Sequence, residues 1–294
     1  MYNPTPASEA FQVNGVWYQD YNVDNGYGQI VVKRYMHDGT QWVEAPTNTD
    51  GGNTTRKKID LLKHVPETAA GINLKKSTIN LDKCLINLEK SSGVNMTGHT
   101  ARVATIMDYS GSMRPLYKDG SVQQCLNRLA SLALRFDDNG ELDVWLFHGG
   151  YRRLESMDIS NFENYVDEVM MGCGERFGAT SYAPVLRDVK CKYVDEEPSK
   201  YPAFVIFVTD GSNDDKHSTD DIIRELSHHN VFVQFVGIGY DSFSYLRKLD
   251  DLKGRPVDNT GFISVADINR LSDEELYNKL LEQYIPWLKA MHIG

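Results

Sequence analysis

Short apolar runs alternate with longer amphipathic stretches over residues 100–291 of the chain. The run at 204–208 is apolar at every position, which is typical of a strand covered on both faces. Repeated alternation of such runs with helical patterns predicts an α/β fold with a mostly parallel sheet and helices on both faces. The runs that we expect to form its strands are 102–107, 142–147, 203–208, 231–236 and 257–263, with 153–157 as an antiparallel edge strand.

The stretches between these runs predict helices. We place them roughly at 122–136, 159–171, 184–193, 219–229 and 242–249. A further helix follows the last predicted strand. It begins at a capping box formed by Ser272 and Glu275, and its apolar stripe continues to Tyr284. Pro286 then bends or restarts this helix, because proline has no N–H group and clashes with the preceding turn.

The N-terminal 45 residues predict a small β-rich region. Runs rich in β-branched and aromatic residues occur at 13–18, 29–35 and 41–44, with turn signals between them. They favour a three-stranded meander, and they contain no catalytic or ligand-binding motif. Residues 46–58 are polar and glycine-rich, so we expect a flexible linker there.

Residues 59–96 carry an internal repeat. Ile-Asn-Leu units begin at 72, 79 and 86, each followed by a lysine two residues after the leucine. The isoleucine and leucine are two residues apart, which places them on one face of a strand but on opposite sides of a helix. We therefore expect short strands or extended segments. Two roles remain open: a docking strip that adds strands to another chain, or a structured lead-in that packs on the following domain.

Composition narrows the classes of partner. A net charge of −10 and a pI near 5.3 argue against nucleic acid or an anionic membrane as the main partner, because both require basic patches. The four cysteines form no C-x-x-C pair and no Cys/His cluster, so we expect reduced thiols. No run approaches the ~18 apolar residues of a membrane span, and no secretory signal is recognisable at the start. These features favour a cytoplasmic protein without a membrane span.

Oxygen-bearing side chains follow two of the predicted strands. Asp108, Ser110 and Ser112 come at every second position after the apolar run 103–107, and Asp210 follows the run 203–208. In open α/β sheets, ligands bind outside the carboxyl ends of the strands. Carboxylate and hydroxyl oxygens suit a hard cation such as Mg²⁺. Thr180, in a separate glycine-containing loop, offers a further hydroxyl.

These three pieces together resemble the metal-ion-dependent adhesion site (MIDAS) of von Willebrand factor A (VWA) domains. The resemblance covers residues 100–291, and it implies a Rossmann-like, doubly wound sheet of six strands in the order 3-2-1-4-5-6. Further stretches resemble the A domain at the C-terminal end of TerF-type tellurium-resistance proteins; they are 97–99, 119–123, 234–237, 246–250 and 257–262. We therefore place a VWA domain at 97–294.

The resemblance implies a role for each site residue. Ser110 and Ser112 are expected to be direct ligands of Mg²⁺, for which Mn²⁺ or Ca²⁺ could substitute. Thr180 is expected to be a third ligand, direct or through water, with Ser181 taking its place if the loop register differs by one. Asp108 and Asp210 supply negative charge, at least one of them through a bound water. One coordination position then stays open for an Asp or Glu carboxylate of a protein partner.

Three function classes follow. The first is a non-enzymatic, Mg²⁺-dependent interaction module of a cytoplasmic tellurium-resistance or stress-response system, with other Ter-type proteins among its partners. The second is a metal-independent VWA scaffold. The third is a Mg²⁺-dependent hydrolase, which Ser110 disfavours because aspartyl phosphatase chemistry needs an acid at that position. In some A domains the C-terminal helix, here 272–291, moves when the site gains a ligand.

Further predictions concern residues near the expected ligands. Tyr109 lies between two of the expected ligands, and we favour a surface position from which it contacts a partner over packing below the site. Asp214 and Asp215 are expected in a solvated loop. His148 is expected to end a strand without binding metal, because it has no partner histidine at metal spacing.

Overall fold

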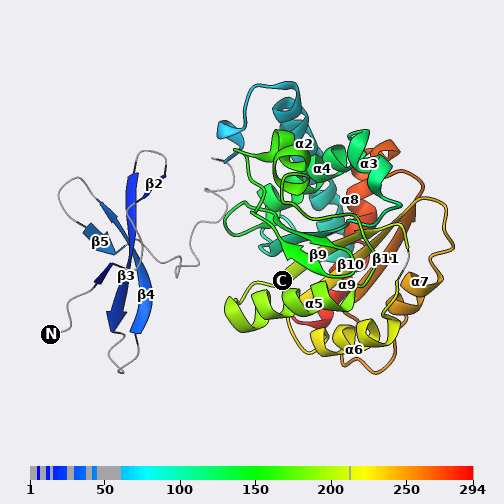
Figure 1. The fold of residues 1–294 in the computed structure, drawn as a ribbon. Coiled ribbons are helices and arrows are strands. Elements are labelled where there is room, and N and C mark those ends of the chain that lie inside the picture. The colour runs from blue at the N-terminus through cyan, green and yellow to red at the C-terminus, as the bar shows by residue number, and fades with distance from the viewer. Residues whose placement is uncertain are drawn as a thin grey trace. The chain divides into compact units, whose positions relative to one another are not determined.

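The computed structural model describes residues 5–6, 11–13, 16–24, 30–37, 42–44, 61–211 and 213–293. The chain divides into two compact units, Met1–Asn53 and Thr54–Gly294. In the first unit, antiparallel strands pair in the order β1-β3-β4-β5, and β2 pairs with β3 (Figure 1). Their bounds are Thr5–Pro6 (β1), Phe11–Val13 (β2), Val16–Asp24 (β3), Ile30–His37 (β4) and Trp42–Glu44 (β5). The predicted linker at 46–58 lies outside the described residues.

The second unit is built on a six-stranded sheet with the order β8-β7-β6-β9-β10-β11. In chain numbering this is the predicted order 3-2-1-4-5-6, and all neighbouring strands are parallel except β7 and β8. The doubly wound α/β prediction is therefore confirmed. The strands are β6 (Arg102–Asp108), β7 (Asp143–Phe147), β8 (Tyr151–Arg153), β9 (Ala203–Thr209), β10 (Val231–Ile238) and β11 (Thr260–Val265).

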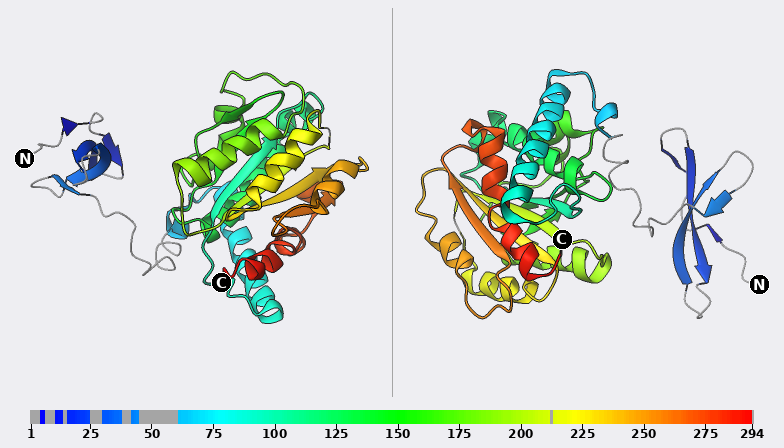
Figure 2. Two further views of the ribbon diagram at one scale, coloured as in Figure 1. Left: turned by 90° about the horizontal axis from the view of Figure 1, so that it is seen from below. Right: turned by 180° about the vertical axis from the view of Figure 1, so that it is seen from behind.

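Helices cover both faces of this sheet (Figure 2). α2, α4, α8 and α9 pack on one face, and α5, α6 and α7 pack on the other. Their bounds are α2 (Ala69–Ser92), α3 (Arg114–Lys118), α4 (Ser121–Phe136), α5 (Ala183–Lys190), α6 (Lys216–Leu226), α7 (Ser244–Asp250), α8 (Asp273–Leu281) and α9 (Tyr284–Ala290). Shorter helical turns are η1 (Phe162–Asn164), η2 (Val166–Met170), η3 (Cys191–Glu196) and η4 (Ile268–Arg270). None of the helices in the described ranges is long and apolar enough to cross a membrane.

The central strand β9 shows how the two layers are fixed by sequence. Side chains alternate between the faces of a strand. Phe204, Ile206 and Val208 accordingly join the core under α2, α4, α8 and α9, whereas Val205 and Phe207 join the core under α5, α6 and α7. Because both faces are covered, the strand is apolar at each of these positions, as predicted.

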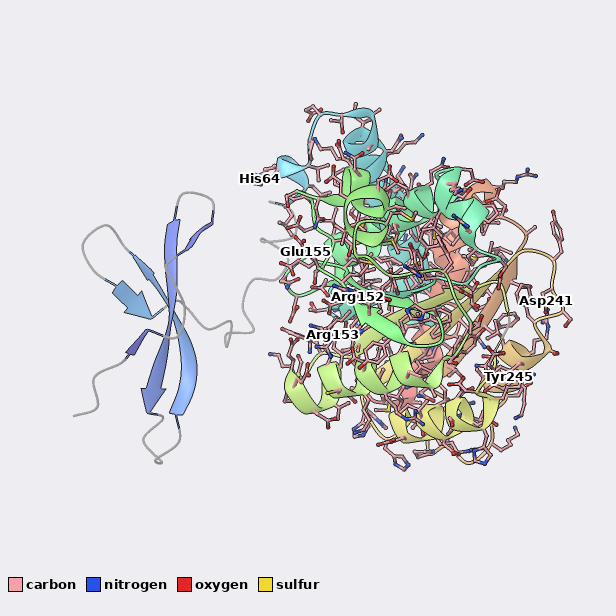
Figure 3. All side chains as sticks on the ribbon, viewed as in Figure 1. His64, Arg152, Arg153, Glu155, Asp241 and Tyr245 are labelled. Atoms are coloured by element: carbon pink, nitrogen blue, oxygen red, sulfur yellow. The ribbon has the colours of Figure 1, made fainter. Side chains whose placement is uncertain are left out.

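The edge strand β8 lies at 151–153 instead of the predicted 153–157. Arg153, labelled in Figure 3, fixes this strand to the helix layer through an ion pair of its Nε with Asp188 Oδ2 at 2.9 Å. The same carboxylate oxygen accepts a hydrogen bond from Trp145 Nε1 at 2.7 Å. A long-range pair between β8 and α5 therefore helps to set the bounds of a strand whose own sequence is weakly patterned.

Residues 159–171 do not form the single helix that the sequence predicts, because a side chain interrupts it. Gln123 of α4 donates from Nε2 to the carbonyl oxygen of Phe162 at 2.7 Å, and its Oε1 accepts from the backbone N–H of Val166 at 2.8 Å. In an α-helix those two backbone groups would bond to each other. Insertion of Gln123 thus leaves the separate turns η1 and η2.

Residues 72–90 form part of a 24-residue helix, α2, so the expectation of short strands is wrong. Thr68 Oγ1 caps its start by accepting from Gly71 N at 3.0 Å, and Gly93 ends it with a φ of 72°. The buried positions recur at helical spacing; they are Leu74, Ser77, Thr78, Leu81, Cys84 and Leu85. Because 77 and 78 are polar, a reading based on apolar residues alone did not find this stripe.

The C-terminal prediction is confirmed. Ser272 and Glu275 form a reciprocal capping box at the start of α8, with Ser272 Oγ accepting from Glu275 N at 3.2 Å. The chain leaves the helical path after Leu281 and restarts as α9, which carries Pro286 in its first turn. A proline is tolerated there because the first N–H groups of a helix have no partner within the helix.

Candidate metal-binding site

Asp108 and Asp210 lie at the ends of two adjacent parallel strands. β6 pairs with β9 with Met107 opposite Val208, so Asp108 ends its strand beside Thr209 and Asp210. Because the carboxyl ends of parallel strands meet at one edge of the sheet, the two carboxylates lie at the same edge. The electrostatic repulsion between Asp210 and Asp108 is among the causes that raise the pKa of Asp108.

Asp108 is fully buried and both its oxygens accept hydrogen bonds. Oδ1 accepts from the backbone N–H of Ser110 at 2.8 Å, and Oδ2 accepts from Thr209 Oγ1 at 2.7 Å. Burial raises the pKa of Asp108 to about 6, although hydrogen bonds from Thr209 and Ser110 lower it. In the described part of the chain, neither Asp108 nor Asp210 pairs with a basic side chain. A bound cation would offset the cost of ionising this buried group.

The hydroxyl groups of Ser110 and Ser112 lie next to each other. Their Oγ atoms are 3.1 Å apart. In an octahedral complex with oxygen ligands at about 2.1 Å, neighbouring ligand atoms are about 3.0 Å apart. The pair therefore fits two adjacent positions around one Mg²⁺-sized ion. Ser110 is buried whereas Ser112 is exposed, so the pair lies at the boundary with solvent.

Thr180 is held beside the loop that follows β9. Its backbone N–H donates to Asp214 Oδ2 at 3.1 Å, and its carbonyl oxygen accepts from Asp214 N at 2.8 Å. The adjacent Ser181 bonds in another direction, with its N–H donating to the carbonyl oxygen of His148 at 2.9 Å. Thr180 is buried, at 5% exposure, and Ser181 is half-buried. Of the two residues, Thr180 is therefore the one that is bonded to the loop after Asp210, and this favours Thr180 over Ser181 as the site residue.

Asp214 is exposed, as expected of a solvated loop, whereas Asp215 is half-buried, and the carboxylates of both accept hydrogen bonds from backbone N–H groups. Asp215 accepts from the backbone N–H groups of Tyr182 and Ala183, both at 2.9 Å, at the start of α5. Such carboxylates satisfy helix N–H groups that have no partner within the helix. The two acids join the loop of Thr180 to the loop that begins with Asp210. Sequence alone gave no signal of this, because the partners are more than 30 residues away.

Thr209 is a site residue that the sequence reasoning did not single out. Besides its bond to Asp108, its Oγ1 lies 3.1 Å from the hydroxyl oxygen of Tyr182, and it is fully buried. One hydroxyl thus connects the ends of β6 and β9 with the segment after Thr180. A polar residue at the end of an otherwise apolar strand was the available signal.

Tyr109 packs below the site, so the favoured surface position is wrong. It is 2% exposed and stacks on Phe177 with ring centroids 3.9 Å apart, while Tyr117 meets its ring edge-on at 5.1 Å. The carbonyl oxygen of Tyr109 accepts from Gly178 N at 3.1 Å. Stacking and backbone pairing together hold the loop that carries Ser110 and Ser112 against the segment that leads to Thr180.

His148 follows the last residue of β7, as predicted. Its Nδ1 accepts from Gly150 N at 3.0 Å, and its Nε2 is 3.2 Å from Glu175 Oε2. Both ring nitrogens are therefore engaged with other groups.

The predicted ligands at the sheet edge carry little negative charge. Within the residues that the structure describes, no group of three or more His, Cys, Asp or Glu side chains could hold a metal ion. The site predicted from sequence has two carboxylates, and its other oxygens are hydroxyls. Such a set is typical of a hard cation that keeps waters or external ligands, and it does not fit a zinc site built from Cys and His.

The chain is similar to a family model, to a protein of known sequence and to solved structures. A family model described as "vWA found in TerF C terminus" matches residues 100–293. YcbR of Bacillus subtilis (strain 168) is 46% identical over 196 residues, which are 66% of this chain and 80% of YcbR. Manganese-loaded Plasmodium vivax TRAP protein has a TM-score of 0.47 at 19% identity, covering 64% of this chain and 74% of its own. Mussel byssus proximal thread matrix protein 1 with a zinc-occupied MIDAS motif has a TM-score of 0.48 at 16% identity, covering 68% of this chain and 51% of its own.

Proposed function

Since the chain belongs to the family of von Willebrand factor A domains found at the C terminus of TerF, we propose that its A domain is a metal-dependent protein-interaction module. The observation that carries the proposal is the pair of hydroxyl oxygens of Ser110 and Ser112, 3.1 Å apart, beside the buried carboxylate of Asp108. This spacing suits two adjacent ligands of Mg²⁺.

We assign the roles from the positions of the donors. Ser110 and Ser112 bind the ion directly, and Thr180 supplies a third hydroxyl, directly or through water. Asp108 already accepts two hydrogen bonds, so it acts through a bound water, and Asp210 adds the second negative charge. Mg²⁺ is the proposed ion; Mn²⁺ and Ca²⁺ also prefer oxygen ligands.

The proposed partner group is an Asp or Glu carboxylate of another protein. Neutral hydroxyls as direct ligands leave much of the ion's charge unneutralised, and this favours an anionic sixth ligand over water. The proposal is non-enzymatic, because Ser110 occupies the position two residues after Asp108 where aspartyl phosphatase chemistry requires an acid. Family membership also motivates the proposed setting, a cytoplasmic tellurium-resistance or stress-response complex with other Ter-type proteins.

Affinity capture from lysate of the native host tests the proposal. The full chain is used as bait in Mg²⁺ and in EDTA, and the variant Asp210→Ala is used in Mg²⁺, with circular dichroism to verify folding. We expect a partner that only the wild type in Mg²⁺ retains. A partner retained in all three conditions would instead identify a metal-independent scaffold.

Asp214 should support metal binding without being a ligand. Asp214→Ala removes the acceptor for Thr180 N, so we expect metal affinity to fall about tenfold, as when other groups that orient ligands are lost. Asp214→Asn keeps an oxygen acceptor and should retain most of the affinity. Isothermal titration with Mn²⁺ measures both. Equal affinity in wild type and Asp214→Ala would mean that this contact does not position Thr180 for the ion.

A further inference from the structure

The outer face of α2 carries a row of exposed isoleucines. Ile72, Ile79 and Ile86 are 53%, 52% and 44% exposed. They are half of the large apolar side chains exposed in the described residues; the others are Tyr151, Met171 and Tyr240, which lie on separate elements. A single exposed apolar residue needs no explanation, but a regular series on one helix face is typical of an interaction surface.

Lysines alternate with these isoleucines along the same line. Lys76, Lys83 and Lys90 are exposed, and the combined row runs 72, 76, 79, 83, 86, 90, with spacings that alternate between four and three residues. At 3.6 residues per turn, all six side chains leave the helix within about 80° of one another and span about 27 Å of its length. We name these six residues the Ile/Lys row. Its spacing is that of one seam of a coiled coil.

The positive charge of the Ile/Lys row is not neutralised within the described part of the chain. None of its three lysines forms an ion pair there. The acidic residues of α2 next to the row are engaged elsewhere. Asp82 pairs with Arg135 Nε at 2.5 Å, and Glu89 accepts from Thr97 N at 2.9 Å. A chain with a net charge of −10 therefore presents three unpaired ammonium groups on one helix face.

We propose that the Ile/Lys row docks an acidic amphipathic helix of another protein. Such a helix, with apolar and Asp/Glu residues at alternating spacings of three and four, would bury the isoleucines and pair with the lysines along their full length. This mode replaces the strand addition considered from the sequence, because the repeat is helical and offers no free strand edge. It is independent of the metal site at the sheet edge.

Two other occupants fit less well. A second copy of α2 would bring three more lysines to the same seam, and like charges in one interface disfavour association. A membrane surface binds helices that present a wide apolar face with basic residues beside it. Here the isoleucines form one narrow row, and the lysines lie within that row.

A synthetic peptide tests the proposal. The probe is a fluorescein-labelled helix of four heptads that carries Leu and Glu at alternating spacings of three and four, titrated with the full chain by fluorescence anisotropy. We expect saturable binding that persists in EDTA. Ile79→Ser with Ile86→Ser should lower affinity at least tenfold. Lys76→Glu, Lys83→Glu and Lys90→Glu together should abolish binding of the Glu peptide and confer binding of a matched Lys peptide.

The control substitutions also introduce serine on α2, but at positions outside the Ile/Lys row. Asn73→Ser with Asn87→Ser alters two exposed positions and should leave binding unchanged. Absence of saturable binding, equal affinity in the row variants, or failure of the charge exchange would overturn the proposal. Two further results would also overturn it. One is sedimentation of the chain with phosphatidylglycerol vesicles, and the other is self-association in analytical ultracentrifugation, in each case if the isoleucine variant loses it. Circular dichroism verifies that each variant folds.

Discussion

Replacing Asp108 with asparagine should abolish metal binding and, in metal-free buffer, make the folded protein more stable. Asparagine has almost the same shape, and its side chain can still accept from Ser110 N and bond with Thr209 Oγ1. What it removes is a buried negative charge close to Asp210. That charge attracts a cation, but without one it opposes folding. The two effects therefore have opposite signs.

The pH dependence of stability follows from the direction in which folding shifts the pKa of Asp108. Burial raises the pKa of Asp108 from 3.8 to about 6, so ionising it costs more in the folded chain than in the unfolded chain. The metal-free wild type should gain stability as the pH falls from above 6 towards 4, where the folded state takes up the proton first. The advantage of Asp108→Asn should therefore be full above pH 6, at roughly 1–3 kcal/mol, and vanish near pH 4.

Thermal unfolding with and without Mn²⁺ measures both effects. At an ion concentration of about 100 times the dissociation constant, the wild type should gain about 2.7 kcal/mol, which is about 5–10 °C in a domain of this size. Asp108→Asn should show no gain. Asp167→Asn makes the same chemical change at an exposed position and should behave as the wild type. An ion-induced gain in Asp108→Asn equal to that of the wild type would exclude this carboxylate from the site.

The parts of the fold that the sequence predicts are those set by local pattern. β9 is apolar from Ala203 to Val208 because both faces are covered, so its position could be read directly. The positions of Asp108 and Asp210 at strand ends follow from the same reading. The capping box at Ser272 is also local, since it needs only two residues three apart.

The parts that the sequence missed depend on partners far along the chain. Gln123 breaks the helix at 159–171 from about 40 residues away. The hydrogen bonds of Asp214 and Asp215 go to the backbone of Thr180 and of the start of α5, which lie more than 30 residues earlier in the chain. Tyr109 follows an aspartate in a polar loop, and only the packing of Phe177 shows why it is buried. Each case needs a tertiary contact that no local pattern encodes.

The largest error, the strand reading of α2, has a physical cause that also yields a prediction. The isoleucine and leucine of each repeat do not share a face: Leu81 is fully buried, whereas Ile79 is 52% exposed. Leu81→Ala should destabilise the protein by about 2–5 kcal/mol, because it leaves a cavity in the core shared with α4 and α8. Ile79→Ala should change stability by less than about 0.5 kcal/mol, since alanine favours the helix and no cavity forms.

Urea unfolding followed by circular dichroism distinguishes these outcomes. If α2 were an appendage that the A domain does not need, both substitutions would leave the main unfolding transition unchanged. If the repeat were a strand with both side chains on one buried face, both would be strongly destabilising. A large loss for Leu81→Ala with none for Ile79→Ala fits only a helix that is part of the domain core on one side. Its other side, which carries the isoleucines, then contributes nothing to folding and is available to bind a partner.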